Sequence, residues 1–430
     1  MTQRETGDGS PPRTSVPLRP WASLRHRDFR LLLSSSLCIA AGQQMRQTAN
    51  FYQVYAISGS SLQLGLTGLF QAVPLLVLGI FGGTLADLLD RKKLIVLGVA
   101  LNLLLGVALG VLTLTGTIRV SHILVTTAVT ASVNIVLSPA RMAMIPRLVP
   151  RSHLMNAVSL NSSTGQASQF IGPLLAGLSI AWLGMASAYF FNALLYVPAV
   201  IAVLSLRTSG APQVQERASV TALMGGVRHI WRQRVLIALF LLDFGVISVG
   251  YFRPLLPIFA QDIYKVGPAG FGLLAASPAI GAVLGAATLL MVGNVRRKGP
   301  LVLWAVLLYS LCLALFSVTP WFWLAILFSA GLGFTNALNA ITRQTTVQIL
   351  TPDHLRGRVF GIFTIFGQGA NSVGTMEAGF VASLLGAPRA MLLGGGIGAA
   401  VTLAFWGGWP VLRRFRTGAG PEEAQEPMAH

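Results

Sequence analysis

The sequence predicts an all-α polytopic membrane protein, with twelve transmembrane helices in two pseudo-symmetric six-helix bundles. Its 430 residues are 53% hydrophobic and only 10% charged, whereas soluble domains carry about 25% charged residues. Apolar stretches of about 18 residues or more, long enough to cross a bilayer as a helix, recur along the whole chain. The number of cations between these stretches alternates from one gap to the next. Together these observations exclude a soluble fold.

Charge clusters and Gly/Pro turns divide the chain into twelve apolar segments, which are the predicted helices. Most gaps between them are a few residues long. The exception is the polar stretch 207–234, whose part VTALMGGVRHIW is typical of an amphipathic helix at a membrane interface. The segments span residues 29–57, 63–86, 94–115, 120–141, 157–184, 187–206, 233–259, 270–293, 300–319, 321–348, 357–385 and 388–411.

These segments group into two bundles, flanked by tails and joined by a linker. The N-terminal tail is polar and rich in Pro and Arg, which is typical of disordered chain, and it lacks the apolar stretch of a signal peptide. The predicted boundaries are 1–28 for the disordered N-terminal tail, 29–206 for the first bundle, 207–232 for the linker, 233–411 for the second bundle and 412–430 for the C-terminal tail.

The distribution of cations predicts the orientation in the membrane. The tails and the gaps after the second, fourth, sixth, eighth and tenth segments, with the segment ends beside them, hold 26 of the 31 Lys and Arg residues. The other gaps hold only Arg119, Lys265 and Arg389, while Arg46 and Arg253 lie within segments. Because loops rich in Lys and Arg stay on the cytoplasmic side, we expect both termini and the linker in the cytoplasm.

The two halves of the chain repeat. Residues 134–150, NIVLSPARMAMIPRLVP, match residues 336–352, NALNAITRQTTVQILTP, and 64–74, LGLTGLFQAVP, echo 271–281, FGLLAASPAIG. The fourth segment thus corresponds to the tenth, and the second to the eighth. Duplicated halves joined by a long cytoplasmic loop are typical of transporters that bind substrate between the repeats. Four positions match at a constant offset of 202: Asn134 and Asn336, Arg141 and Arg343, Leu148 and Leu350, and Pro150 and Pro352.

A cluster of charge interrupts the apolar sequence after the second segment. Residues 82–93, GGTLADLLDRKK, hold two aspartates and three cations, whereas 94–118 hold no charge. The cations have a plain role in fixing topology, but positive-inside topology requires no acid. A carboxylate near a helix N-terminus is favoured by the helix dipole by about 0.3–1 kcal/mol. Asp87 therefore points to a further role.

This stretch resembles the loop motif G-x-L-a-D-R-x-G-R-(R/K) of the major facilitator superfamily. Leu88 stands in place of the first basic residue of the motif, and Asp90 in place of its glycine. The resemblance implies that Asp87 joins a charge network with an arginine of the fourth helix and the start of the eleventh, which latches the halves together on the cytoplasmic side. Arg141 and Arg343, near the cytoplasmic ends of their segments, equally fit snorkelling residues. The expected gate and latch residues are Gly83, Asp87, Asp90, Arg91, Lys92, Arg141, Arg343, Arg356 and Arg358.

The fifth segment contains IGPLLAGL, which resembles the G-P-x-x-G-G motif of antiporters in this superfamily, with Ala176 in place of the first paired glycine. Gly172, Pro173 and Gly177 allow close helix packing and a kink. With FRLLLSSSL, SPARMAMIPRLVP, GPAGFGLL and LRGRVFGI, residues 25–412 resemble the twelve-helix branch that includes enterobactin and macrolide exporters. The resemblance implies efflux.

Polar residues inside membrane helices are costly and mark candidate functional surfaces. The first segment carries a polar stripe at i, i+3, i+4 and i+7, and the fourth, tenth and eleventh carry polar faces. The resemblance implies that the first, fourth, seventh and tenth helices surround a central cavity. Single amides also fit hydrogen bonding between helices, whereas Arg46 needs water, an acid or an anionic ligand. The predicted cavity residues are Gln43, Arg46, Gln47, Asn50, Asn134, Ser138, Asn336, Asn339, Gln368 and Asn371.

Only two acids, Asp243 and Glu377, are predicted deep within segments, and each is a candidate proton carrier. Asp243 has an alternative role as a gate residue paired with an arginine. Glu377 points about 180° away from Gln368 at ~100° per residue, toward a neighbouring helix. Arg253, near the outer end of the seventh segment, is expected to pair with Asp262 or to line an outer gate.

We therefore expect a secondary transporter, not an enzyme, which exports a small amphipathic or weakly anionic molecule in exchange for protons. It is expected to work as a monomer in a bacterial cytoplasmic membrane, driven by the proton gradient, without cofactor, metal or nucleic acid. The sequence has no phosphate-loop, zinc-spacing or nucleophile-elbow motif. The alternatives are an importer or facilitator, for example of lysophospholipids, and a membrane-embedded enzyme or scaffold. The lack of acid–His and Cys–His constellations argues against the enzyme, and the buried charges argue against the scaffold.

Overall fold

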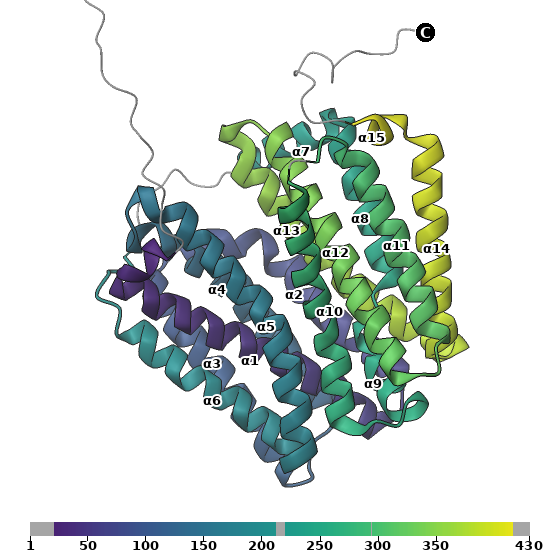
Figure 1. Ribbon diagram of the computed structural model, residues 1–430. Helices are drawn as coiled ribbons and strands as arrows, with labels where there is room; N and C mark the ends of the chain where they lie inside the picture. The colour runs from purple at the N-terminus through teal and green to yellow at the C-terminus, as the bar shows by residue number, and fades with distance from the viewer. Residues whose placement is uncertain (1–20, 212–219, 294, 416–430) are drawn as a thin grey trace, which may run out of the picture.

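The structure is a computed structural model of an all-helical protein (Figure 1). It describes residues 21–211, 220–293 and 295–415, and its account of side chains leaves out 80–88, 220–224, 226 and 353–354. The described residues contain no strand. The α-helices are α1 (Arg27–Ser58), α2 (Ser61–Leu88), α3 (Arg91–Leu114), α4 (Val120–Leu148), α5 (Leu154–Leu183), α6 (Met185–Leu204), α7 (Val220–Arg232), α8 (Arg234–Gly250), α9 (Leu256–Ile258), α10 (Gly267–Val292), α11 (Lys298–Val318), α12 (Phe322–Leu350), α13 (Asp353–Leu385), α14 (Ala387–Gly408) and α15 (Pro410–Arg414), with short turns η1 (Ala22–Arg25), η2 (Arg151–His153), η3 (Arg253–Leu255) and η4 (Phe259–Ile263).

Nine helical segments among the described residues are long and apolar enough to cross a membrane. They are α2, α3, α4, α6, the run from α8 to η4, α10, α11, α12 and α14. Helices α1, α5 and α13 have 32, 30 and 33 residues and pack among them, but carry more polar side chains. The predicted all-α polytopic class is therefore confirmed, while the count of twelve spans stays a prediction.

The seventh predicted segment, 233–259, is not one continuous helix. α8 ends at Gly250, Tyr251 adopts an extended conformation, and the chain resumes as η3, α9 and the π-helical turn η4. Pro254 lacks the N–H that would continue the hydrogen-bond ladder of α8. The break frees backbone carbonyls, and the Tyr309 hydroxyl donates to one of them, Gly250 O, at 3.0 Å.

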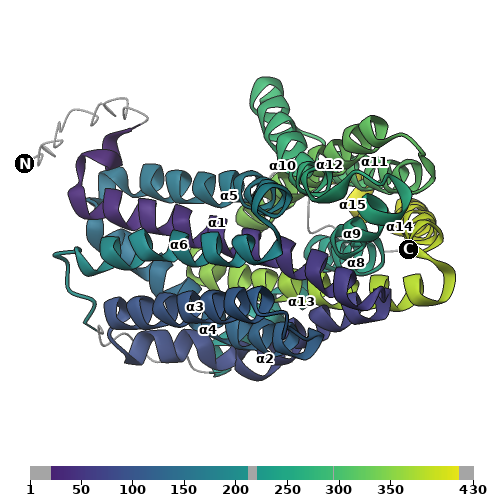
Figure 2. The same cartoon turned by 90° about the horizontal axis from the view of Figure 1, so that it is seen from below.

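The long helices form an N-terminal half (α1–α6) and a C-terminal half (α8–α14), and α7 of the predicted linker packs on α8 and α13. Two helix pairs make the most extensive packing between the halves: α2 with α13 and α5 with α10 (Figures 1 and 2). We call the end of the molecule that holds Arg27 and Arg414 the tail end, and the opposite end the far end. In Figure 1 the halves diverge toward the tail end, at the top, and converge at the far end.

Two glycine pairs make the approach between the halves possible. A Cβ on Gly177 of α5 would lie 2.5 Å from Gly272 Cα of α10, and one on Gly65 of α2 would lie 3.1 Å from Gly379 Cα of α13. Gly65 and Gly272 are equivalent positions in the repeat LGLTGLFQAVP and FGLLAASPAIG, and Gly177 and Gly379 are 202 residues apart. Small residues allow membrane helices to approach closely. The two crossings are therefore related by the duplication.

The buried apolar clusters show which end is closed. One cluster joins both halves and includes Val54, Ala176, Phe271 and Ala378, all toward the far end. Toward the tail end the clusters are separate: one belongs to the N-terminal half and two to the C-terminal half. The structure is thus packed shut at the far end, and no apolar core described here joins the halves at the tail end.

Candidate functional site

A small pocket lies between the halves, from the middle of the molecule toward the far end. Its walls come from α1 and α5 on one side and from η3, α9 and α10 on the other. The mixture of amides, a hydroxyl, one guanidinium and two phenyl rings suits an amphipathic ligand. The lining residues are Gln44, Gln47, Thr48, Phe51, Pro173, Arg253, Leu256, Phe271 and Ala275.

Two polar bonds join the halves beside this pocket. Arg253 donates to Gln169 Oε1 of α5 at 3.0 Å, and the Tyr55 hydroxyl of α1 bonds to the Asp262 carboxylate of η4. The expected pairing of Arg253 with Asp262 is therefore wrong, because each residue is bonded to a residue of the other half. The alternative expectation, that Arg253 lines an outer gate, stays a prediction.

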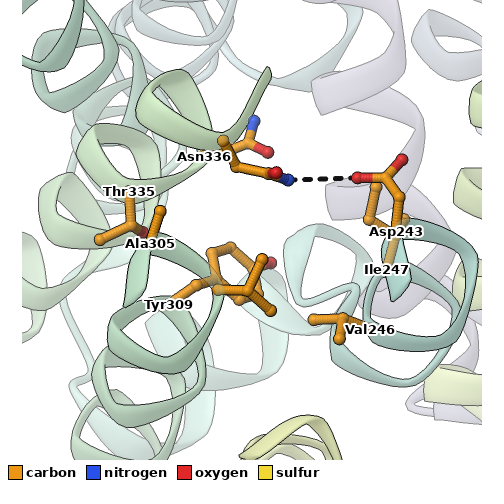
Figure 3. A pocket seen from close by; sticks show the side chains of 9 residues that line it. Asp243, Val246, Ile247, Ala305, Tyr309, Thr335 and Asn336 are labelled. Carbon is orange, nitrogen blue, oxygen red and sulfur yellow. Dashed lines mark hydrogen bonds between the residues drawn. The ribbon is translucent and has the colours of Figure 1, made fainter. Parts of the chain in front are cut away.

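A second pocket lies inside the C-terminal half, between α8, α11 and α12 (Figure 3). Asp243 on its wall forms an ion pair with Arg343 and accepts a hydrogen bond from Asn339 Nδ2 at 3.2 Å, the dashed line in Figure 3. The side chains of Asp243 and Arg343 are only 11% and 18% exposed. Tyr309, which bonds to Gly250 O at the α8 break, lines the same pocket.

Arg343 was expected at a gate between the halves, and this expectation is corrected by its pairing with Asp243 in its own half. An aromatic group covers the pair: the Arg343 guanidinium lies 5.8 Å from the ring centre of Phe363, which packs on Phe240. The cation is therefore held by a carboxylate and a ring face. The sequence alternative in which Asp243 pairs with an arginine agrees with this geometry.

The polar stripe of α1 is turned away from the expected cavity at two positions. Arg46 is only 3% exposed and donates to Asn102 Oδ1 of α3 at 3.1 Å. Asn50 donates to Thr127 and accepts from the Tyr189 hydroxyl of α6. Both side chains therefore lie inside the N-terminal half, which corrects the prediction that they line the cavity.

The face of α1 that lines the pocket lies about a quarter turn from the predicted stripe at ~100° per residue, and of that stripe only Gln47 reaches it. Gln43 instead donates to Asn134 Oδ1 of α4 at 2.6 Å. Asn336 is exposed and lines the Asp243 pocket. Ser138, Gln368 and Asn371 are exposed, and their cavity role stays a prediction.

Glu377 is half-buried on α13 and makes no ion pair or hydrogen bond with the residues that the structure describes. The residues on its side of the helix, Val373, Phe380 and Leu384, are apolar and 39%, 54% and 68% exposed. The opposite side carries Gln368. Glu377 therefore lies on the apolar outer face of α13, away from both pockets.

The charged motif that runs from the last turns of α2 into α3 is described only in part, because Gly83 and Asp87 fall among the residues whose side chains lie outside the description. Asp90 caps α3 by accepting from Lys93 N at 3.0 Å. Lys92 Nζ donates to Leu204 O and Leu206 O at 2.9 and 2.7 Å, and so caps α6 of its own half. A gate role for Lys92 between the halves stays a prediction.

The other expected gate residues also make their described contacts within one half. The Arg91 N–H donates to Gly210 O at 2.9 Å, and Arg141, half-buried, lies near Tyr196. Arg356 donates to Gln348 O at 3.4 Å, and Arg358 is exposed beside α7. Their part in a latch stays a prediction.

Two glycines of the fifth segment lie at close helix contacts. A Cβ on Gly172 would lie 2.8 Å from Ala41 O of α1, and Gly177 faces Gly272 of α10. Pro173 between them lines the pocket between the halves. The motif thus sets the contacts of α5 with both neighbours.

Two related helical halves, a polar pocket between them and a closed far end define a membrane transporter of the alternating-access kind. The chain belongs to the transmembrane secretion effector family of the major facilitator superfamily, whose family model matches residues 18–416. The multidrug efflux pump Tap of Mycolicibacterium fortuitum is 27% identical over 370 residues, 83% of this chain and 89% of that protein. The enterobactin exporter EntS of Escherichia coli is 27% identical over 343 residues, 79% of this chain and 80% of that protein.

Solved structures show the same fold. A POT-family peptide transporter in complex with alafosfalin aligns with a TM-score of 0.73 and 15% identity, over 94% of this chain and 98% of that chain. The nucleoside transporter NupG aligns with a TM-score of 0.69 and 14% identity, over 88% of this chain and 98% of that chain. The predicted major facilitator fold is confirmed.

Proposed function

We propose that this protein is a secondary active transporter that exports small amphipathic molecules in exchange for protons. It would act as a monomer in a bacterial cytoplasmic membrane, with the tail end in the cytoplasm and the far end outside. The printed names of the relatives Tap and EntS, an efflux pump and an exporter, support this direction. A pocket between the halves with a closed far end suits a state that receives substrate from the cytoplasm.

The observation that carries proton coupling is the buried pair of Asp243 and Arg343. Removing one partner of a buried ion pair costs about 3–5 kcal/mol, because the other charge is left uncompensated. A shift of a two-state equilibrium from 1:99 to 99:1 requires about 5.5 kcal/mol. Protonation of Asp243 is therefore of the right size to change which end of the transporter opens. In this mechanism Asp243 binds its proton from the outside and releases it to the cytoplasm when Arg343 pairs with it.

Substrate and proton occupy different places in this proposal, because no residue lines both pockets. The link between them is the α8 segment, which carries Asp243 near its middle and is followed, after its break, by Arg253. Gly250 to Arg253 form the hinge between the two, and Tyr309 contacts both the Asp243 pocket and Gly250. Coupling would therefore be a movement of α8, and not direct competition for one site.

Transport into inside-out vesicles tests the proposal. With an acidic vesicle interior, the wild type should accumulate an amphipathic dye, and a protonophore should abolish accumulation. Asp243→Asn should lose gradient-driven accumulation, whereas Glu377→Gln, the matched removal of an acid on the outer face of α13, should keep it. Transport that ignores the protonophore would instead indicate a facilitator, and loss in Glu377→Gln alone would move the proton site to α13.

We also propose that Asp87 takes part in a latch at the cytoplasmic end, as the resemblance of its motif implies. Asp87→Asn should weaken closure of that end and favour the state open to the cytoplasm. Spin labels across the cytoplasmic ends of the two halves would report this as a larger fraction of long distances. Unchanged distances with unchanged transport would remove Asp87 from the latch.

A further inference from the structure

The pocket between the halves has one charged lining residue, Arg253, and no acid among its lining residues. Two phenyl rings, Phe51 and Phe271, lie on opposite sides of it, from α1 and α10. A site with one cation, amides and aromatic surface selects for a molecule with an apolar body and an anionic group, because a cationic group would meet repulsion without a counter-charge.

The fold places the Arg253 guanidinium at the pocket without pairing its charge with a described acid. The break after Gly250 turns the chain so that η3 presents Arg253 to the other half. Its bonded partner, Gln169, is neutral, and Asp262 is bonded to Tyr55. Arg253 forms no ion pair with the residues that the structure describes. A half-buried guanidinium whose acceptor is a neutral amide retains most of its capacity to bind an anion.

We propose that Arg253 binds the anionic group of the substrate, a carboxylate, sulfonate or phosphate, and gives up its bond to Gln169 when it does so. This rests on the proposed transport function. An anion that accepts two N–H groups of the guanidinium replaces a single bond to a neutral amide, so the exchange is favourable.

The exchange has a consequence for gating. Gln169 belongs to the N-terminal half and Arg253 to the C-terminal half, and their bond is one of the two polar bonds that join the halves beside the pocket. Gln169 keeps its bond to Gln166 at 3.0 Å after Arg253 leaves. Binding of an anionic substrate therefore removes one of these bonds between the halves, and the Tyr55–Asp262 bond remains to be broken before the far end opens.

The test uses two fluorescent probes of nearly the same shape and different charge: 8-anilinonaphthalene-1-sulfonate and neutral N-phenyl-1-naphthylamine. Affinities are measured on the full chain in nanodiscs, with empty nanodiscs subtracted. The wild type should bind the sulfonate about tenfold more tightly than the amine, since hydrogen bonds to charged groups are stronger than neutral ones. Arg253→Gln should abolish this preference while it keeps the affinity for the amine within about twofold, and Arg253→Lys should retain part of it. Gln169→Ala should bind the sulfonate more tightly, because Arg253 no longer has a competing partner.

Spin labels at Thr117 and Arg389, on the two halves at the far end, report the gating step in a chain with Cys38 and Cys312 replaced by Ser. The sulfonate, but not the amine, should increase the fraction of long distances, and Gln169→Ala should show an increase without probe. A sulfonate preference that survives Arg253→Gln, or no preference or binding in the wild type, would overturn the assignment of Arg253. A preference without any distance change would overturn the exchange with Gln169. The affinity measurement needs no gradient, so Asp243→Asn should keep the preference for the sulfonate over the amine even though it fails to accumulate dye.

Discussion

Asp243 of α8 and Arg343 of α12 form an ion pair inside the C-terminal half, and Asn339, one turn before Arg343, donates to the same carboxylate at 3.2 Å. Both charges are thus compensated within one half, while the cation of the pocket between the halves, Arg253, has only an amide partner. This asymmetry gives the two charged sites different properties. The Asp243 site is stable only while it holds its charge pair, and the Arg253 site is open to an external anion.

The first prediction concerns the stability of the pair. Asp243→Asn and Arg343→Gln each leave one buried charge uncompensated, so each should lower the free energy of unfolding by about 3–5 kcal/mol. The double variant removes both charges and should recover most of that loss. Thermal unfolding of the four proteins in one detergent completes the cycle. Losses that simply add in the double variant would show that the two charges are not coupled.

The second prediction concerns the break after α8. Tyr309→Phe removes the hydroxyl that donates to Gly250 O, a bond worth about 0.5–1.5 kcal/mol. This bond holds the last carbonyl of α8, after which the chain turns into η3 and places Arg253 at the pocket. The variant should therefore also reduce the sulfonate preference severalfold. Tyr264→Phe is the matched control: it removes a half-buried hydroxyl that donates to Thr319 O at 3.2 Å without contact with the α8 break. Equal loss of preference in both variants would contradict a specific role for Tyr309.

The repeat and the membrane class were predictable from the sequence because they depend on composition and spacing. The facing glycines Gly65 and Gly379, and Gly177 and Gly272, belong to the motifs that reveal the duplication. The break at Tyr251 had a local signal as well, since Gly250 and Pro254 flank it.

The direction in which each polar face points was not predictable. Helical spacing correctly puts Arg46 on one face with Gln43 and Asn50, but only the packing of α3 and α6 decides that this face turns into the bundle. The partners Asp243 and Arg343 are far apart in sequence, and no local pattern joins them. Gln44 and Thr48 could not be named from the sequence, because the packing of the opposite half decides which face of α1 lines the pocket.

The third prediction concerns pH and the chain after α6. Partial burial by itself raises the pKa of Asp28, but hydrogen bonds from Thr208 and Arg207, at 2.8–3.0 Å, and the nearby Arg27 cation hold its pKa below the ordinary value. A depressed pKa means that the stabilisation is complete above the unfolded value of about 3.9 and is lost as pH falls through the folded value.

Hydrogen exchange of the Arg207 and Thr208 amides should therefore show the same protection at pH 5 and pH 8, after correction for the intrinsic exchange rate. Asp28→Ala should abolish this protection at both pH values and leave the amides of α3 unchanged. Protection that survives in the variant would assign these amides to another acceptor.

The fourth prediction concerns closure of the far end. A Cβ on Gly177 would lie 2.5 Å from Gly272 Cα and 2.7 Å from Pro268 O, so Gly177→Ala forces the two halves apart where backbone faces backbone. Overpacking of this kind costs about 1–3 kcal/mol, enough to favour the state with an open far end by about one to two orders of magnitude.

Gly65→Ala should have a smaller effect, since its Cβ would lie 3.0 Å from Met376 O and 3.1 Å from Gly379 Cα. Gly165→Ala, on the same helix as Gly177 but with nothing within 4 Å, is the control and should match the wild type. The Thr117–Arg389 distance should lengthen most in Gly177→Ala, less in Gly65→Ala and not at all in Gly165→Ala. Gradient-driven accumulation should fall most in Gly177→Ala, less in Gly65→Ala and not at all in Gly165→Ala. An equal response of Gly177→Ala and Gly165→Ala would mean that the glycine crossing does not control closure.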